Sequence, residues 1–378
     1  MDNQIASCGH PLAFQAATGN RPSLLGMGRG KSTYKVETRM LSGHQKEAVV
    51  QEGADGQSWR MTSDEGQHLK GHDEAPFPLG FFNAGLLGDV MTRLSALAEA
   101  KGMSASDIAA TLKNYYWFEG SFARGTGVGQ ADISELQFEG LNEQTRELVE
   151  LALRASPAID ALKSVMPATF ALYVNGQRKP ITTLVASDAP DASDPYLVHA
   201  KPPEPLNTHR FDPIVKPGVV QEGERDPFPD TVEGRLLRRV SGRAAFTPEG
   251  AVCSDTWLDM PGMSHFHLIS DDRAAGNVAP SSLGYFAAGV AFCFMTQLSR
   301  YMTAMKLKTG SLRLVQYWPF EIDDEGRGIA HPVDTHLFLN GTADAETHEM
   351  LVRVAANTCY LHAALRAELP PRVDTKLG

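Results

Sequence analysis

Two of the four cysteines in this chain have a spacing and a setting that could support redox chemistry. The chain of 378 residues contains Cys8, Cys253, Cys293 and Cys359. A thiolate is a strong nucleophile, and a second thiol within reach can turn an oxidised sulfur into a disulfide. Cys293 lies in the apolar run YFAAGVAFCF, and Cys359 follows 66 positions later in NTCYLHAAL. We interpret Cys253 as a packing residue and Cys8 as part of a flexible tail.

Composition and charge narrow the class of protein. Apolar residues make up 42% of the chain and charged residues 21%, which is typical of a folded domain. The net charge of −10 argues against a nucleic-acid partner, because phosphate binding needs a basic surface. We find no secretory signal over 1–14 and no apolar run near the roughly 18 residues of a membrane span. We therefore expect a cytoplasmic protein with reduced thiols and no membrane partner.

No metal or cofactor is expected from the sequence. His265 and His267 place two imidazoles on one face of a strand, but two histidines alone are weak evidence for a metal site, and we interpret them as polar surface. The glycines near the N-terminus precede no phosphate-binding loop.

The chain contains an internal repeat. Residues 79–94 read LGFFNAGLLGDVMTRL and residues 283–298 read LGYFAAGVAFCFMTQL, with eight of 16 positions identical. Tyr116-Trp117 resembles Tyr317-Trp318, and LVELALRASPAIDALKS resembles LVRVAANTCYLHAALRA. The matches keep one order at offsets between 201 and 204, which indicates duplication.

The repeat predicts the domain organisation and the fold class. We expect a flexible tail over 1–31, a first domain over 32–185, a proline-rich connector over 186–230 and a second domain over 231–378. Each copy shows strand-like alternation, then a long helix that is apolar on nearly every face, over 80–101 and 284–306. Further strands and a second helix follow. This order predicts an α+β fold with mainly antiparallel sheets around two central helices.

The second copy resembles the OsmC/Ohr family of thiol peroxidases in its AAxxxCF-like helix and in the spacing of its two cysteines; the first copy resembles it more weakly. The resemblance implies antiparallel sheets wrapped around two helices, normally assembled as an intertwined homodimer with active sites at the interface. A tandem chain would then be an intrachain pseudo-dimer. The family's chemistry implies that Cys293 attacks a peroxide and that Cys359 resolves the sulfenic acid into a disulfide.

The thiol of Cys293 needs help to ionise, because burial in an apolar helix raises the pKa of a cysteine. In the family an arginine on an early strand supplies the cation. Arg243 matches that place here, with Arg238 and Arg239 as further candidates. Cys359 aligns with Ser156, which Pro157 follows as in a helix N-cap, so we expect Cys359 at a helix N-terminus.

Two departures from the family pattern stand out. The family often places a glutamate at the start of the cysteine helix, where this sequence has Ser282 and Leu283, and Asp271 or Asp272 is a candidate substitute. The first copy carries Asp89 in place of Cys293 and Ser156 in place of Cys359, so it cannot run a thiol–disulfide cycle. We expect it to be a structural partner in which Asp89 makes an ordinary polar contact, with a general-base role as the alternative.

The leading hypothesis is a thiol-dependent peroxidase that uses Cys293, Cys359 and Arg243. Its partners would be a small hydroperoxide or hydrophobic electrophile and a dithiol reductant, and the chain could form a homo-oligomer. A thiol-dependent hydrolase or transferase on the same scaffold is the first alternative. A non-catalytic protein that binds a hydrophobic ligand is the second.

Overall fold

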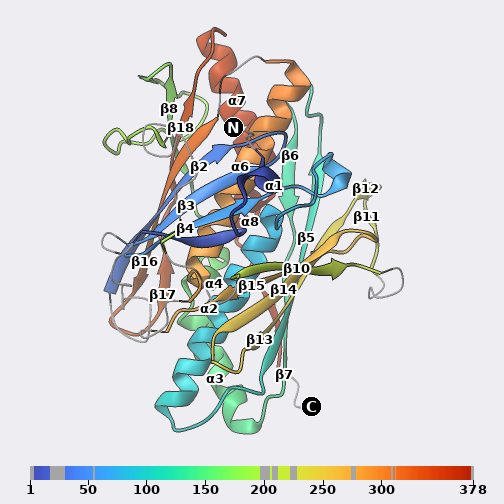
Figure 1. Ribbon diagram of the computed structural model, residues 1–378, viewed down its shortest axis with the longest axis vertical. Helices are drawn as coiled ribbons and strands as arrows, with labels where there is room; N and C mark the ends of the chain where they lie inside the picture. The colour runs from blue at the N-terminus through green and yellow to red at the C-terminus, as the bar shows by residue number, and fades with distance from the viewer. Residues whose placement is uncertain are drawn as a thin grey trace.

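Two long helices lie between two large β-sheets in the computed structural model of this chain (Figure 1). The structure describes residues 4–17, 30–53, 56–195, 205–206, 212–221, 228–273, 278–307, 310 and 312–375. The fold is mixed α+β, and this part of the sequence-based prediction is confirmed. Its helices are α1 (Ile5–Cys8), α2 (Pro78–Ala100), α3 (Glu143–Arg154), α4 (Pro157–Lys163), α6 (Ser282–Met305), α7 (Ala345–Thr358) and α8 (Tyr360–Arg366), with a 3-10 turn η2 (Gln67–Leu69).

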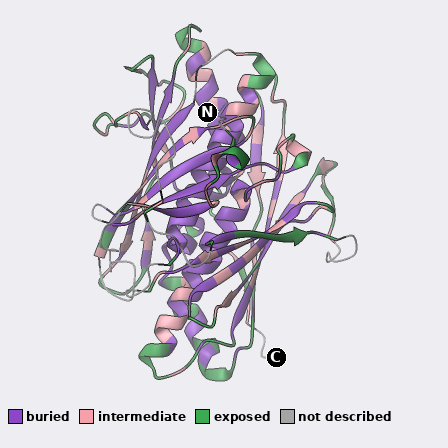
Figure 2. Cartoon of the chain, in the orientation of Figure 1, coloured by how far each residue is buried: buried purple, intermediate pink, exposed green. Residues whose placement is uncertain are grey.

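Helices α2 and α6 form the centre of the core, as their apolar sequences predict (Figure 2). They pack closely at two glycines: a Cβ on Gly85 would lie 2.4 Å from the Phe286 nitrogen, and one on Gly289 would lie 2.8 Å from the Phe82 nitrogen. Larger residues at these positions would force the two backbones apart. The close approach places Cys293 on α6 deep inside the molecule.

Helix α6 departs from the expectation that no apolar run approaches the length of a membrane span. Its 24 residues are long and apolar enough to cross a membrane by length and composition. However, 94% of its most apolar stretch is buried inside the protein, as in the core helix of a folded domain. Burial between the sheets accounts for its composition.

The first large sheet combines strands from both halves of the chain. Strand β2 pairs antiparallel with β16 over ten residues, with Ser32 opposite Phe320, and β18 continues the sheet in parallel with β8. The order is β1-β4-β3-β2-β16-β18-β8-β9, and β17 pairs with β16. The strands are β1 (Ala13–Ala17), β2 (Gly30–Met40), β3 (Lys46–Glu52), β4 (Ser58–Ser63), β8 (Thr169–Val174), β9 (Gln177–Lys179), β16 (Arg313–Ile322), β17 (Gly328–Ala330) and β18 (Asp334–Leu339).

The second large sheet also combines both halves, but here the strands before the long helix come from the second half and the three strands that follow it from the first half. Strand β13, from the second half, pairs antiparallel with β5, from the first half, with Arg238 opposite Tyr116. The order is β10-β15-β14-β13-β5-β7-β19, and β6 pairs with β5. The strands are β5 (Ala109–Glu119), β6 (Val128–Ala131), β7 (Glu135–Glu139), β10 (Ile214–Val219), β13 (Arg238–Phe246), β14 (Val252–Leu258), β15 (Ser264–Ser270) and β19 (Arg372–Asp374); β11 (Thr231–Val232) and β12 (Arg235–Leu236) form a separate small ribbon.

The two halves therefore carry the same order of elements and are interlaced. Three strands, a long helix, three strands, two shorter helices and a strand occur in each half. The three strands before each long helix form one block, and one strand of that block, β2 or β13, pairs with the first strand after the long helix of the other half, β16 or β5. A site on either helix is consequently built from both halves of the sequence.

The register of the ladders corrects one of the sequence matches. Tyr116 is buried on β5, whereas Tyr317 on β16 is half-buried and its neighbour Trp318 is buried. Alternate residues of a strand face opposite sides, so the two Tyr-Trp pairs have opposite orientations and are not equivalent. Tyr116 lies opposite Arg238 on β13, and Phe320 lies opposite Ser32 on β2. If β13 and β2 are aligned as equivalent strands with Arg238 at the position of Ser32, Tyr116 is equivalent to Phe320.

Two segments expected to lack regular structure contain ordered elements. Within the predicted tail, α1 and β1 are formed, and Phe14 on β1 is fully buried beneath the Arg60 guanidinium. Within the predicted connector, β10 pairs with β15 at the sheet edge, where Pro217 needs no donor on its exposed side. Most of the remaining connector, including 196–204 and 207–211, lies outside the described residues.

Candidate active site

The structure brings Cys293 and Cys359 together. Cys293 lies in the fourth turn of α6, and Cys359 is the N-cap of α8, as its alignment with Ser156 predicts. The two thiols lie close enough for each to shift the pKa of the other, and both are free cysteines. Cys293 is 3% exposed and Cys359 is fully buried. Two residues that are 66 positions apart in the sequence thus form one thiol pair.

The surroundings act in opposite directions on the two thiols. Burial and the neighbouring Cys359 raise the pKa of Cys293 well above its ordinary value, and the Leu361 N–H opposes this only in part. Burial also raises the pKa of Cys359, but the neighbouring Cys293 thiol and the His362 ring and backbone N–H together lower it well below its ordinary value. The two thiols titrate as a coupled pair, in which Cys359 is the more readily ionised member.

His362 lies on α8, three residues after Cys359. Its ring packs against Phe294, with ring centres 5.3 Å apart, and against Phe170 at 6.0 Å. Both ring nitrogens are buried without a hydrogen bond of regular geometry to any described residue. The Cys359 thiol is a polar group beside the ring, and that contact favours the thiolate form.

Replacing His362 is expected to move the ionisation of the thiol pair to higher pH. The ring lowers the pKa of Cys359, so His362→Gln should raise it, and the thiolate should persist over a narrower range. Ultraviolet thiolate absorbance followed against pH measures this directly. Cys253→Ser is the matched control, since Cys253 lies on β14 and burial raises its pKa. An unchanged titration in His362→Gln would show that the ring does not act on the pair.

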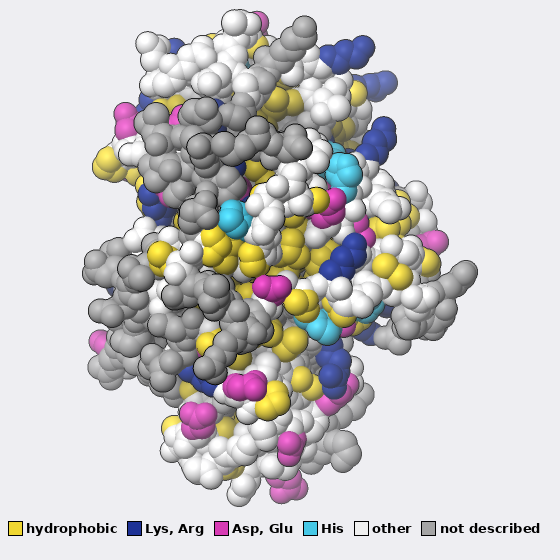
Figure 3. Space-filling model, in the orientation of Figure 1, with side chains coloured by type: hydrophobic (Ala, Val, Ile, Leu, Met, Phe, Trp, Pro, Cys, Tyr) yellow, Lys and Arg dark blue, Asp and Glu magenta, His cyan; other side chains and the backbone are white. Residues whose placement is uncertain are grey.

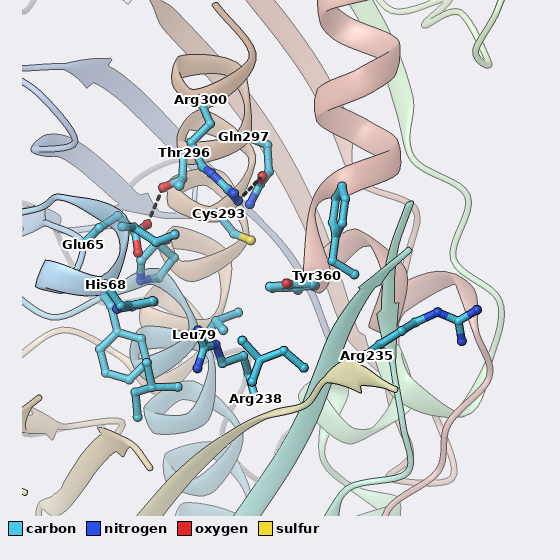
Figure 4. A pocket seen from close by; sticks show the side chains of 16 residues that line it. Glu65, His68, Leu79, Arg235, Arg238, Cys293, Thr296, Gln297, Arg300 and Tyr360 are labelled. Atoms are coloured by element: carbon cyan, nitrogen blue, oxygen red, sulfur yellow. Dashed lines mark hydrogen bonds between the residues drawn. The ribbon is translucent and has the colours of Figure 1, made fainter. Parts of the chain in front are cut away.

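Cys293 also lines a cavity of about 280 Å³ (Figure 4). Its walls come from both halves of the chain. They include the loop before α2 with Glu65 and His68, and one face of α6 with Gln297 and Arg300. The described lining is Glu65, His68, Leu69, Phe77, Pro78, Leu79, Phe118, Arg235, Leu236, Arg238, Leu258, Cys293, Thr296, Gln297, Arg300 and Tyr360. A small molecule in this cavity would meet Cys293 before Cys359.

The structure does not place Arg243 at this site. Its guanidinium is half-exposed and pairs with Glu139 at 3.0 Å. The neighbouring Gly242 faces α2, since a Cβ built there would lie 3.0 Å from Leu87. Successive strand residues point to opposite faces, so Arg243 points away from the helices and from the thiols.

Arg238 takes the place expected for Arg243. It lies five residues earlier on β13, hence on the opposite face, and lines the cavity of Cys293. Arg239 points outward like Arg243, where it pairs with Asp259 at 2.7 Å and lies over the Phe228 ring. Of the three arginines on this strand, only Arg238 faces the cavity.

The carboxylate near Cys293 comes from the first half of the chain. Glu65 accepts a 2.5 Å hydrogen bond from Thr296 on α6, and Lys46, fully buried, lies 3.5 Å away. Its charge also raises the pKa of Cys293, after burial and the effects of Cys359. A carboxylate bound in this way anchors the loop to α6.

The two substitutes proposed from the sequence lie elsewhere. Asp272 bonds to Ser282 at the start of α6 and to Thr92 on α2, and Asp271 pairs with Arg273. The hydrogen bond from Thr92 to Asp272 is the counterpart, in the other half of the repeat, of the hydrogen bond from Thr296 to Glu65. Strand exchange is the reason: the loop before each long helix serves the other helix.

The first half holds a polar cluster where the second has its thiols. Asp89 accepts hydrogen bonds from Ser156 Oγ at 2.6 Å and from the Ala158 N–H at 3.2 Å. Arg93, also buried, pairs with Asp89 at 2.9 Å. Asp89 thus makes the polar contact expected of it and ties α2 to the N-terminus of α4.

Comparison with known proteins gives one partial likeness. No family model matches the chain, and no curated protein matches it. A solved OsmC-like hydroperoxide resistance protein from Jannaschia sp. CCS1 is 22% identical and aligns over 32% of this chain and 79% of its own, with a TM-score of 0.22. Part of this chain resembles an OsmC-like protein.

Three residues of the site escaped the sequence analysis. Glu65 lies in the other repeat from Cys293, so nothing near the cysteine motif marks it. His68 lies in the same loop. Arg300 could have been found, because it follows Cys293 by seven residues and helical spacing puts positions 293, 296, 297 and 300 on one face.

Among the described residues, no group of three or more histidine, cysteine or carboxylate side chains is arranged to hold a metal ion. His265 and His267 both lie near Asp255, at 3.1 Å and 3.8 Å.

Proposed function

We propose that this chain is a thiol-dependent peroxidase that reduces an organic hydroperoxide through a disulfide cycle of Cys293 and Cys359. The observation that carries the proposal is the thiol pair itself. Its members are close enough to shift each other's pKa, and one of them lines a cavity from which a substrate can approach. Two thiols so placed need no large movement to close a disulfide, whose Cα atoms lie within about 7 Å.

The first step makes use of the opposite ionisation of the two sulfurs. Cys293 passes its proton to the Cys359 thiolate and attacks the terminal oxygen of the hydroperoxide. The O–O bond breaks, and the departing alkoxide takes the proton from Cys359 and leaves as the alcohol. Cys293 becomes a sulfenic acid, and Cys359 is again a thiolate.

The second step closes the disulfide. The Cys359 thiolate attacks the sulfur of the Cys293 sulfenic acid, and the hydroxide that leaves is protonated by solvent to water. A dithiol reductant then opens the bridge and restores both thiols. Because Cys359 lies beside Cys293, resolution competes well with further oxidation of the sulfenic acid.

Mass spectrometry after one equivalent of an alkyl hydroperoxide tests this function. The wild-type chain should lose two hydrogens, and peptide mapping should place a bridge between Cys293 and Cys359. Cys359→Ser should form no bridge, and its Cys293 should be captured as sulfenic acid by a dimedone probe and over-oxidised by excess peroxide. A stable acyl or alkyl adduct after exposure to other electrophiles, with no bridge, would favour a hydrolase or transferase. Thiols that do not react at all would point to a ligand-binding protein.

A further inference from the structure

The cavity in front of Cys293 has a charge that the chain as a whole does not share. The protein carries a net charge of −10, and the visible face shows positive side chains in small separate groups (Figure 3). Yet Arg235, Arg238 and Arg300 line this one cavity, with Glu65 as the single carboxylate among the described lining residues. Such a local excess of cations calls for negative charge from elsewhere.

Two of the charges are already balanced by protein groups. Glu65 is held by the buried Lys46 and by Thr296. Arg235, at the rim, pairs with Glu233 at 2.7 Å and with Glu119 at 3.3 Å. This leaves the positive charges of Arg238 and Arg300.

Neither of these two arginines has a carboxylate within salt-bridge distance among the described residues. Arg238 donates to the Met260 sulfur at 3.0 Å, and Arg300 donates to Gln297 at 3.0 Å and lies 4.9 Å over the Phe122 ring. All of these partners are neutral. Burial lowers the pKa of Arg238, the sign of a cation that has lost water without gaining a counter-charge.

The positions of the two arginines frame the reactive sulfur. Arg300 lies on the same face of α6 as Cys293, about 10 Å further along the helix at 1.5 Å per residue. Arg238 comes from β13 on the other side of Cys293 (Figure 4). His68, in the same cavity, has a buried Nδ1 without a partner among the described residues.

We propose that this cavity recognises an anionic substrate, one that carries a carboxylate or similar oxyanion a few bonds from the atom that Cys293 attacks. Arg238 and Arg300 bind the oxyanion. A guanidinium presents paired N–H donors that match a carboxylate, and such charge-assisted contacts gain strength where water is scarce. The inference rests on the proposed function for the identity of the reacting atom, but the charge preference belongs to the cavity itself.

A matched pair of hydroperoxides tests the preference. Cumene hydroperoxide is neutral, and its para-carboxylate differs only by the charged group. The wild-type chain should form the disulfide at least about tenfold faster with the carboxylate, since a hydrogen bond to a charged group changes binding by about that factor or more. Arg300→Gln and Arg238→Gln should each reduce the ratio toward one, and Arg300→Lys should retain part of it. Arg243→Gln, outside the cavity, is the control and should behave as wild type. Equal rates in the wild-type chain, or a ratio that survives both glutamine variants, would overturn the proposal.

A second measurement separates this inference from the peroxidase proposal. Iodoacetate and iodoacetamide alkylate thiols by the same chemistry but differ in charge, so their rate ratio at Cys293, obtained by peptide mapping, reports the cavity alone. If neither hydroperoxide yields a disulfide but Arg300→Gln lowers the iodoacetate-to-iodoacetamide ratio severalfold, the peroxidase function fails and anion recognition stands. A ratio that both glutamine variants leave unchanged refutes anion recognition, whatever the peroxides do.

Discussion

Cys293→Ser is expected to lower the rate of hydroperoxide reduction at least about 10³-fold, because a serine hydroxyl cannot form the anion that attacks the peroxide. The side chain is nearly isosteric and buried in the middle of α6, so the fold should be retained. Consumption of hydroperoxide in the presence of a dithiol measures the rate, and a urea unfolding curve verifies the fold.

The same substitution at another cysteine is the control for this prediction. Cys253→Ser should leave turnover unchanged, because Cys253 lies on β14 and is not among the residues that line the cavity. Cys359→Ser should oxidise Cys293 more slowly, because the acceptor of its proton is lost, and turnover should then stop as Cys293 over-oxidises. Sustained turnover in Cys293→Ser would mean that another group attacks the peroxide.

Asp89→Ala is expected to destabilise the fold by about 3–5 kcal/mol, the usual cost of leaving one member of a buried ion pair without its partner. Arg93 would keep a charge in a site where it is 3% exposed. The N-cap Ser156 and the Ala158 N–H would lose their acceptor as well. Urea unfolding monitored by circular dichroism gives the change in free energy.

Two further variants show whether the broken Asp89–Arg93 ion pair is the cause. Asp89→Ala combined with Arg93→Met should be more stable than Asp89→Ala alone, since no buried cation that has lost its carboxylate remains. Glu99→Ala, an exposed change on the same helix, should stay within about 0.5 kcal/mol of wild type. If Asp89→Ala cost less than about 1 kcal/mol, the ion pair would not anchor α2 to α4.

The sequence predicted which helices and strands form the site, but not which face of a strand each side chain occupies. Apolar residues on every side of 80–101 and 284–306 fixed two buried helices to within two residues at each end. The alignment of Ser156 with Cys359 placed the second thiol at a helix N-terminus, because capping depends on local residues. The choice among Arg238, Arg239 and Arg243 was wrong, since all three lie on one strand and only the register decides which face the helices.

The strand exchange could not be read from the repeat. A duplicated sequence shows which segments are equivalent but not whether β2 pairs with β5 or with β16, because either choice buries the same alternating face. Glu65 was missed for this reason, and Asp271 and Asp272 were proposed in its place. Each loop serves the helix of the other half, so the search on the cysteine's own side of the repeat found the wrong carboxylates.

Because the two interlaced halves belong to one polypeptide, the two equivalent sites of the repeat, at Asp89 and at Cys293, can carry different residues. Two identical chains with this topology would have to place the same side chains at both ends, so any gain in reactivity at one would bring the same loss of rigidity at the other. Here separate stretches of sequence specify each end. At one end, Asp89 holds α2 and α4 together through its ion pair with Arg93 and its hydrogen bond from Ser156. At the other end, the thiols of Cys293 and Cys359 lie beside a cavity. Anchoring and reactivity are thereby divided between two ends of one molecule.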